Sequence, residues 1–108
     1  MSLPQYILND KGEPVMEPDL DKWIKWRIKA EGFKVAHTFI GDCYISTVFL
    51  GLDHNWSKTG PPVLWETMVF GGELDQRQMR CTGAREQAEA MHAVMVKHVE
   101  AKQLKIKS

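Results

Sequence analysis

Two apolar runs dominate the hydrophobic pattern of the chain, residues 44–52 and 63–70. Both are rich in Val, Ile, Thr, Phe, Tyr and Trp, the residues that suit the pleated surface of a β-strand. Asp53, Asn55 and Gly60, with the two prolines that follow Gly60, supply turn chemistry between them. The pattern therefore predicts two antiparallel strands joined by a loop longer than a tight hairpin.

Both faces of the first predicted strand are largely apolar. Successive side chains of a strand point to opposite faces. The alternation places Tyr44, Val48, Leu50 and Leu52 on one face and Ile45, Phe49 and Gly51 on the other. A sheet with two apolar faces needs a cover on each side, from its own helices or from a second subunit. This pattern leads us to expect a homodimer.

The chain before residue 33 predicts a short hairpin followed by a helix. Residues 5–8 and 14–16 are apolar and flank a turn, which indicates two short strands. Asp19 is the expected N-cap of the helix, and Gly32 the residue that ends it. Trp26 falls off the apolar stripe, which indicates either packing at the helix edge or an interface. The residues of the stripe are Leu20, Trp23, Ile24 and Ile28.

Further strands and a long helix are predicted in the rest of the chain. Residues 33–40 and Gln78–Cys81 indicate strands on either side of the central pair, and Thr82 is the expected cap of the helix 84–102. Residues 103–108 are expected to fray as a basic tail. The helix has an apolar stripe with His92 at its flank, and the stripe comprises Ala84, Ala88, Met91, Met95 and Val99. The predicted fold class is α+β, an antiparallel meander of about four strands packed by a long C-terminal helix, with a short N-terminal hairpin and helix.

Composition and charge narrow the class of protein. The 108 residues carry 14 Lys and Arg and 14 Asp and Glu, so no net charge attracts a phosphate backbone or an anionic membrane. No apolar run approaches the roughly 20 residues of a membrane span, and residues 1–10 lack the pattern of a signal peptide. We therefore expect one cytoplasmic domain over residues 1–108, without a membrane partner. Cys43 and Cys81 are expected to be reduced structural thiols.

Three polar residues near the central strands are candidates for chemistry. Asp53 and His54 follow a strand, where a loop can expose them, and Glu66 lies in an apolar row of the second strand. A buried carboxylate is costly unless it is paired. Glu66 could act as a general base or metal ligand with His54 or His92. It could instead be a structural residue, either a solvent-facing Glu of an edge strand or an acid paired with an arginine. Arg77 and Arg80 are the candidate partners.

Histidine spacing gives a weak indication of a metal site. Zinc-binding histidines on one helix normally lie three or four residues apart, whereas His92 and His98 are six apart and point in different directions. His54, Glu66 and His92 remain the candidate metal ligands, if the fold brings them together. No phosphate-binding loop or nucleophile elbow is present in the sequence, and we expect no cofactor.

The central stretch resembles a known family. The segments STVFLGLDHNW and GPPVLWETMVFGGELD are similar to a family of small proteins encoded by bacteriophages and prophages, in which TVFLGLDH and ETMVFGG recur. The resemblance extends from the helix of Trp23 and Trp26 to the helix of His92, and departs from the family at residues 76–82. It implies a phage-derived cytoplasmic protein and implies no particular activity.

Three classes of function remain open. A non-enzymatic binding or protein-interaction module is favoured, because Trp26 and Trp56 are the rigid aromatic anchors that interfaces use. Its partner would be a second copy or a phage or host protein. The alternative is a small enzyme or metal-binding protein that uses Asp53, His54, Glu66 and His92. Nucleic-acid binding is third, because only the Lys-rich C-terminal tail supports it.

Overall fold

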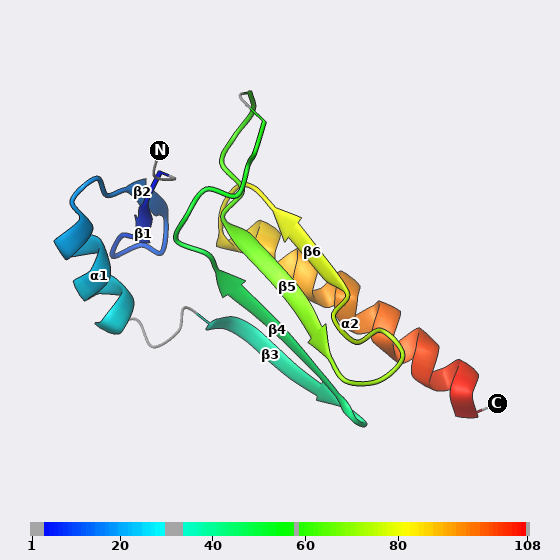
Figure 1. Cartoon of the computed structure of the whole chain (residues 1–108). Helices are drawn as coiled ribbons and strands as arrows, with labels where there is room; N and C mark the ends of the chain where they lie inside the picture. The colour runs from blue at the N-terminus through cyan, green and yellow to red at the C-terminus, as the bar shows by residue number, and fades with distance from the viewer. Residues whose placement is uncertain (1–3, 30–33, 58, 108) are drawn as a thin grey trace.

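The computed structural model describes residues 4–29, 34–57 and 59–107, and it has the α+β architecture that the sequence predicts (Figure 1). A four-stranded antiparallel sheet of order β3-β4-β5-β6 packs against a C-terminal helix, and a two-stranded hairpin and a short helix precede it. In chain order the elements are β1 (Tyr6–Leu8), β2 (Pro14–Met16), α1 (Leu20–Lys29), β3 (Lys34–Ile40), β4 (Cys43–Phe49), β5 (Trp65–Phe70), β6 (Gln78–Cys81) and α2 (Arg85–Lys107).

The register of the sheet confirms the predicted pairing of the two central strands. Tyr44 lies opposite Phe70 and Phe49 opposite Trp65 in the antiparallel pair of β4 and β5. The pattern of alternate burial along both strands is the one expected for a sheet with one covered face. The β-branched and aromatic residues of these runs therefore determine both the strands and their partners.

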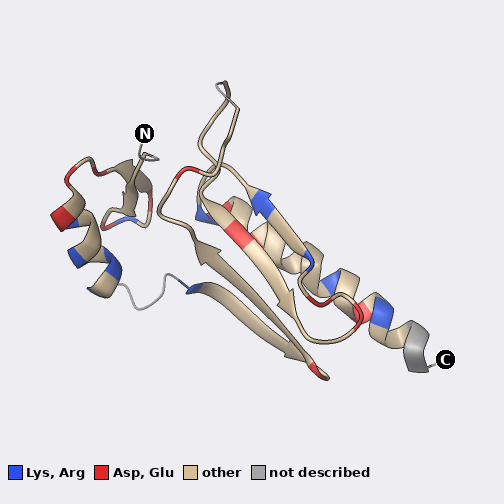
Figure 2. Cartoon of the chain, in the orientation of Figure 1, with Lys and Arg blue, Asp and Glu red and all other residues tan. Residues whose placement is uncertain are grey.

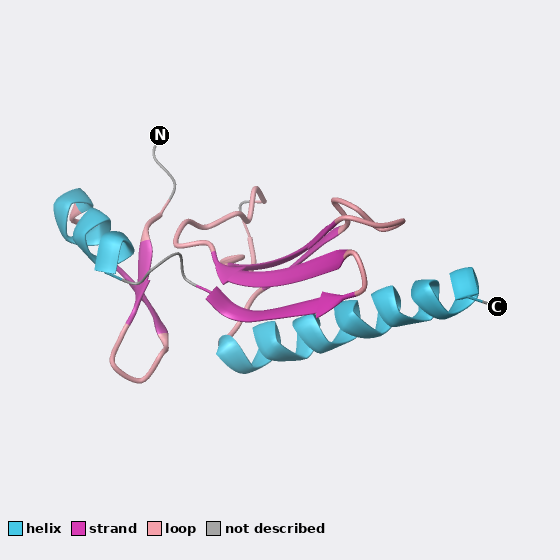
Figure 3. Ribbon diagram, turned by 90° about the horizontal axis from the view of Figure 1, so that it is seen from below, coloured by secondary structure: helices cyan, strands magenta, loops and turns pink. Residues whose placement is uncertain are grey.

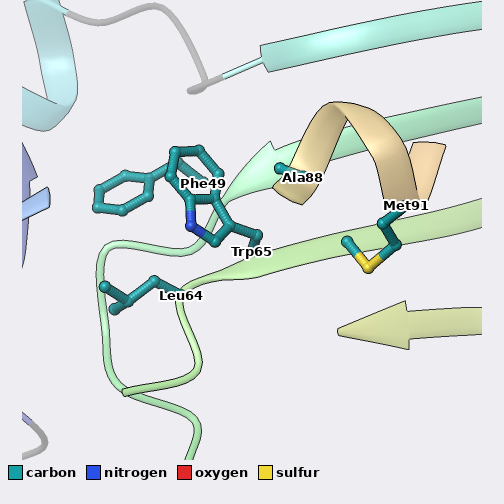
Figure 4. Packing of buried hydrophobic residues seen from close by; sticks show 5 residues of the cluster. All are labelled: Phe49, Leu64, Trp65, Ala88 and Met91. Carbon is teal, nitrogen blue, oxygen red and sulfur yellow. The ribbon is translucent and has the colours of Figure 1, made fainter. Parts of the chain in front are cut away.

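Helix α2 covers one face of the sheet and contacts all four strands. Ala88, Met91, Met95 and Val99 of the predicted stripe are buried against that face, whereas Ala84 is exposed before the helix begins. Figure 4 shows Phe49, Leu64 and Trp65 packed beside Ala88 and Met91. In Figure 3 α2 lies along this face, and no helix of the described part of the chain lies along the opposite one. We call the opposite side of the sheet the open face.

The ends of α2 differ from the prediction. Gln87 takes the capping role expected of Thr82, because its side-chain Oε1 accepts a hydrogen bond from the Ala84 N–H at 2.8 Å. The Gln87 N–H in turn donates to Ala84 O at 3.0 Å. The helix continues past Lys102 to Lys107, where the sequence predicted a frayed tail. This segment contains no Gly or Pro and is rich in strong helix formers, which accounts for the continuation of the helix.

Helix α1 docks through polar atoms of its aromatic and basic side chains rather than through its apolar stripe. The Trp23 Nε1–H donates to both Tyr6 O and Gly51 O at 3.1 Å, and Arg27 Nη1 donates to Leu50 O at 3.2 Å. Three members of the stripe are exposed, Leu20, Ile24 and Ile28. Periodicity records apolar positions and does not detect such hydrogen bonds, so it identified Trp23 as a member of the stripe but not the way in which Trp23 docks. The predicted end of the helix at Gly32 lies outside the described residues.

The chain after β4 is the anchor for the N-terminal elements. The Tyr6 N–H donates to Gly51 O at 2.8 Å, and the Asp53 N–H donates to Pro4 O at 3.1 Å. Gly51 has a φ of +75°, and a Cβ there would lie 3.3 Å from Arg27 Nη1. Glycine is therefore suited to this position on two grounds, its backbone conformation and the closeness of α1.

Candidate functional site

The structure separates the residues that the sequence proposed as a reactive site. Asp53 and His54 lie in the loop after β4, Glu66 lies on the open face, and His92 lies between α2 and the covered face. Glu66 and His92 are on opposite sides of the sheet. Side chains alternate between the two faces along a strand, and His92 contacts Thr47 on the covered face, whereas Glu66 lies on the open face. Within residues 4–29, 34–57 and 59–107, no three His, Cys, Asp or Glu residues are grouped so that they could hold a metal ion.

Glu66 is paired with an arginine, as its structural interpretation predicts. It lies directly opposite Arg80 in the register of β5 and β6, and Arg80 Nε donates to Glu66 Oε2 at 2.7 Å. The Glu66 side chain is 15% exposed and that of Arg80 37%. Arg80 therefore supplies the hydrogen-bond donor for the Glu66 carboxylate within the sheet, and no histidine takes part.

His92, predicted at the flank of the apolar stripe of α2, is part of a buried hydrogen-bond chain. It is 7% exposed, with Nε2 at 2.8 Å from Thr38 Oγ1 and Nδ1 at 2.7 Å from Thr47 Oγ1. The hydroxyl of Thr47 also lies 2.5 Å from that of Thr67. Both ring nitrogens thus have protein partners, which leaves neither for a metal or a substrate.

The surroundings of His92 favour the neutral imidazole. Burial lowers the pKa of His92 below its ordinary value, and the charge of nearby His37 lowers it further. A neutral ring donates from one nitrogen and accepts at the other, which the two threonine hydroxyls can match. One threonine on the inward side of each of β3, β4 and β5 was the sequence signal for this chain of hydrogen bonds, and the spacing between histidines does not reveal it.

Asp53 closes the base of the long loop between β4 and β5. Its Oδ1 accepts from the Asn55 N–H at 2.8 Å and from the Val63 N–H at 3.0 Å, so one oxygen joins the two sides of the loop. The His54 N–H donates to Val63 O at 2.9 Å. The candidate catalytic residue Asp53 is therefore engaged in holding the backbone.

Asn55 and His54 hold the part of the loop that carries Trp56. The Asn55 amide donates to Thr59 O at 3.0 Å and to Pro61 O at 2.8 Å. His54 Nδ1 donates to Leu52 O at 2.8 Å, and its ring centroid is 5.9 Å from that of Trp56. Trp56 nevertheless remains 69% exposed. The loop, which projects beyond the sheet in Figure 1, thus presents a large aromatic side chain on a backbone held by side-chain hydrogen bonds.

The two tryptophans proposed as interface anchors have different environments. Trp26 is half-buried and packs edge-on against Phe49, with ring centroids 5.8 Å apart and planes at 87°. This is the packing at the helix edge that the sequence left as one of two alternatives. Of the two residues, Trp56 is the exposed one.

An aromatic row that sequence reasoning missed crosses the open face of the sheet. Phe39 and Phe70 are the direct cross-strand partners of Tyr44 on β3 and β5. The ring centroids of Tyr44 lie 4.8 Å from Phe39 and 6.0 Å from Phe70. Phe39 is 73% exposed and Phe70 45%. We call Phe39, Tyr44 and Phe70 the aromatic row; the sequence predicted an apolar second face but not this alignment, which depends on the register.

Further structural properties limit the possible functions. Every fully buried side-chain nitrogen or oxygen in the described part of the chain has a hydrogen-bond partner. Acidic and basic positions are spread over the elements rather than gathered on one face (Figure 2). Among the described residues, no helix has the length and apolar character needed to cross a membrane.

Comparison with known proteins adds no relative. No protein-family model, no curated protein and no solved structure matches the chain.

Proposed function

We propose that the chain is a non-enzymatic protein-interaction module that forms a homodimer through the open face of its sheet. The observation that carries the proposal is the aromatic row, three directly opposed rings on a face that no described helix covers. Exposed aromatic side chains of this size are the residues from which interfaces gain most of their binding energy.

The chemistry of the open face favours a second copy as the partner. A two-fold axis brings the same patch of two subunits together, so a row of aromatic rings meets a row of aromatic rings. The Glu66–Arg80 pair already neutralises the charges of its part of the face, so two copies could approach without a surplus of like charge. Two sheets that meet in this way would form a sandwich with their faces about 10 Å apart.

Light scattering coupled to size-exclusion chromatography tests the homodimer. We expect a dimer mass at tens of micromolar for the wild type and a monomer for Phe39→Asp, because the substitution places a charge within the aromatic row. Ile28→Asp is the matched control, since Ile28 is 75% exposed on α1, and it should remain a dimer. A monomeric wild type would refute the proposal.

The Trp56 loop supports a second interaction, with a phage or host protein. An exposed tryptophan on a held loop loses little conformational freedom on binding, which favours affinity. Affinity purification with wild type, Trp56→Phe and Trp56→Ala tests this. A specific partner should be retained by the wild type, weakened with phenylalanine and lost with alanine; retention by Trp56→Ala would contradict the role of the loop.

The proposal includes a cytoplasmic location and an origin in a phage or prophage. Its support is the resemblance of segments 46–56 and 60–75 to proteins of that origin. Cell fractionation tests the location, and the flanking genes test the origin. We expect phage genes on both sides, and a bacterial housekeeping operon would contradict it.

A further inference from the structure

A cavity of about 370 Å³ that is open to solvent lies at the surface between α2 and the loop that joins β5 to β6. Its lining consists of three basic side chains, Arg77, His98 and Lys102, together with Leu74 and Ala101. None of the lining residues belongs to the aromatic row or to the Trp56 loop. Its composition is that of a site with a cationic part and an apolar part.

The β5–β6 loop fixes the backbone of Arg77. The Arg77 N–H donates to Leu74 O at 2.9 Å, and Arg77 O accepts from the Val69 N–H at 3.0 Å. Gln76, directly before it, has a φ of +68°, a left-handed conformation at a residue that is not glycine. Such a conformation costs on the order of 1 kcal/mol and persists only where the surrounding contacts enforce it. The position of Arg77 beside α2 is therefore defined by the loop.

Helix α2 supplies the other two basic side chains. His98 and Lys102 are four residues apart, which places them on the same side of the helix. Lys102 Nζ lies 3.6 Å from Glu73 Oε1, a long contact between half-exposed side chains. The other acid of the loop, Asp75, uses Oδ1 to accept from the Gly71 N–H at 2.7 Å. Within the described ranges, no ion pair neutralises Arg77.

The size and lining of the cavity indicate its ligand. The volume lies within the range of about 300–1,000 Å³ that small-molecule sites occupy, and is far larger than the space of roughly 30 Å³ for one water. A bare oxyanion would leave most of it unfilled. Arginine presents a planar set of donors that matches the oxygens of a phosphate, and Leu74 and Ala101 offer an apolar surface next to it.

We propose that this cavity binds a phosphate monoester with a small apolar or aromatic body. Arg77 and Lys102 bind the phosphate oxygens, His98 adds a further hydrogen-bond donor, and Leu74 and Ala101 contact the body. The phosphate could be part of a free small molecule or of a phosphorylated side chain, since both present the same group. This site is independent of the homodimer and of the partner of Trp56.

Titration calorimetry on the full chain with phenyl phosphate tests the proposal. Inorganic phosphate and phenol supply the two halves of the ligand, and we expect phenyl phosphate to bind at least about tenfold more tightly than either. A phosphotyrosine peptide identifies the source: tighter binding than phenyl phosphate indicates a phosphorylated protein, and equal or weaker binding a free small molecule. Phenyl phosphate that binds no better than phenol overturns the proposal.

Charge variants test the assignment of residues. Arg77→Gln should weaken phenyl phosphate at least about tenfold, and Arg77→Lys should restore part of the affinity because it restores the charge. Arg85→Gln is the matched control, because Arg85 is an exposed cation of α2 paired with Glu89, and its affinity should equal that of the wild type. Equal weakening by Arg77→Gln and Arg85→Gln would show non-specific attraction and refute the site.

A variant that is expected to gain affinity provides a further test, because a loss of folding cannot produce tighter binding. Glu73→Gln removes the carboxylate that competes for Lys102, so it should tighten phenyl phosphate severalfold, and by less at high salt because exposed charges are screened. Unchanged or weaker binding by Glu73→Gln would exclude Lys102 from the site. The circular dichroism of each variant verifies that the fold is retained.

Discussion

His92 Nδ1 lies 2.7 Å from Thr47 Oγ1, and this contact joins α2 to the centre of the sheet through a polar interaction within the hydrophobic core. The ring also contacts Thr38 on β3 through Nε2. The His92 side chain thus contacts two adjacent strands, β3 and β4, and constrains the position of α2 over them.

Replacing His92 by Leu should lower the free energy of unfolding by about 1–3 kcal/mol, because the buried hydroxyl of Thr47 and the partly buried hydroxyl of Thr38 lose a partner. Urea denaturation measures the change. The double variant His92→Leu with Thr47→Val should recover part of the loss, since both members of the pair become apolar. His98→Leu, an exposed site on the same helix, should change stability by less than about 0.5 kcal/mol.

Stability should also depend on pH through His92. Its folded pKa is lowered, so between that value and the ordinary value of about 6.5 the unfolded chain binds a proton that the folded chain does not. The free energy of unfolding should therefore fall as the pH drops below about 6.5, and this contribution should level off below the folded pKa. His92→Gln should be less sensitive over the same range in urea titrations, and equal sensitivity would contradict the assignment.

The Glu66–Arg80 pair should contribute modestly to stability. Because Arg80 is 37% exposed, solvent screens the pair, and a double-mutant cycle of Glu66→Gln and Arg80→Gln should give a coupling of about 0.2–1 kcal/mol. The coupling should shrink in 1 M salt, where the screening length is about 3 Å. A coupling near zero in low salt would show that the contact is not formed in solution.

Asn55→Ala should loosen the Trp56 loop without unfolding the protein. The substitution removes the amide that donates to Thr59 O and Pro61 O. Hydrogen exchange should accelerate at Ser57, whose N–H donates to Asn55 Oδ1, while the amides of β4 and β5 keep their protection. Acceleration throughout the sheet would instead show that the loop supports the whole fold.

The strands and α2 could be predicted from sequence because their patterns record burial directly. Alternate positions of β4 and the stripe of α2 are apolar where they meet, so periodicity identifies both faces. The docking face of α1 could not be predicted in this way, since Trp23 and Arg27 bind backbone carbonyls and leave Ile24 and Ile28 exposed.

The sequence identified the candidate residues but not their positions relative to one another. The pairing of Glu66 with Arg80 was one of several interpretations, beside a functional acid, a solvent-facing Glu and a pair with Arg77, and the register of β5 and β6 decides in its favour. His54 and His92 were grouped because their chemistry is alike, whereas the fold gives each a different structural partner. Sequence spacing does not determine which residues of distant segments share a face of the sheet.

The order of elements along the chain has a consequence for biosynthesis. All four strands of the sheet precede α2, and α2 supplies Ala88, Met91, Met95 and Val99 to the core. During translation the strands therefore leave the ribosome before the helix that covers them. In that interval Ile45, Phe49 and Val69 are not covered by α2. The nascent chain therefore exposes hydrophobic surface to chaperones and to neighbouring chains until α2 has emerged.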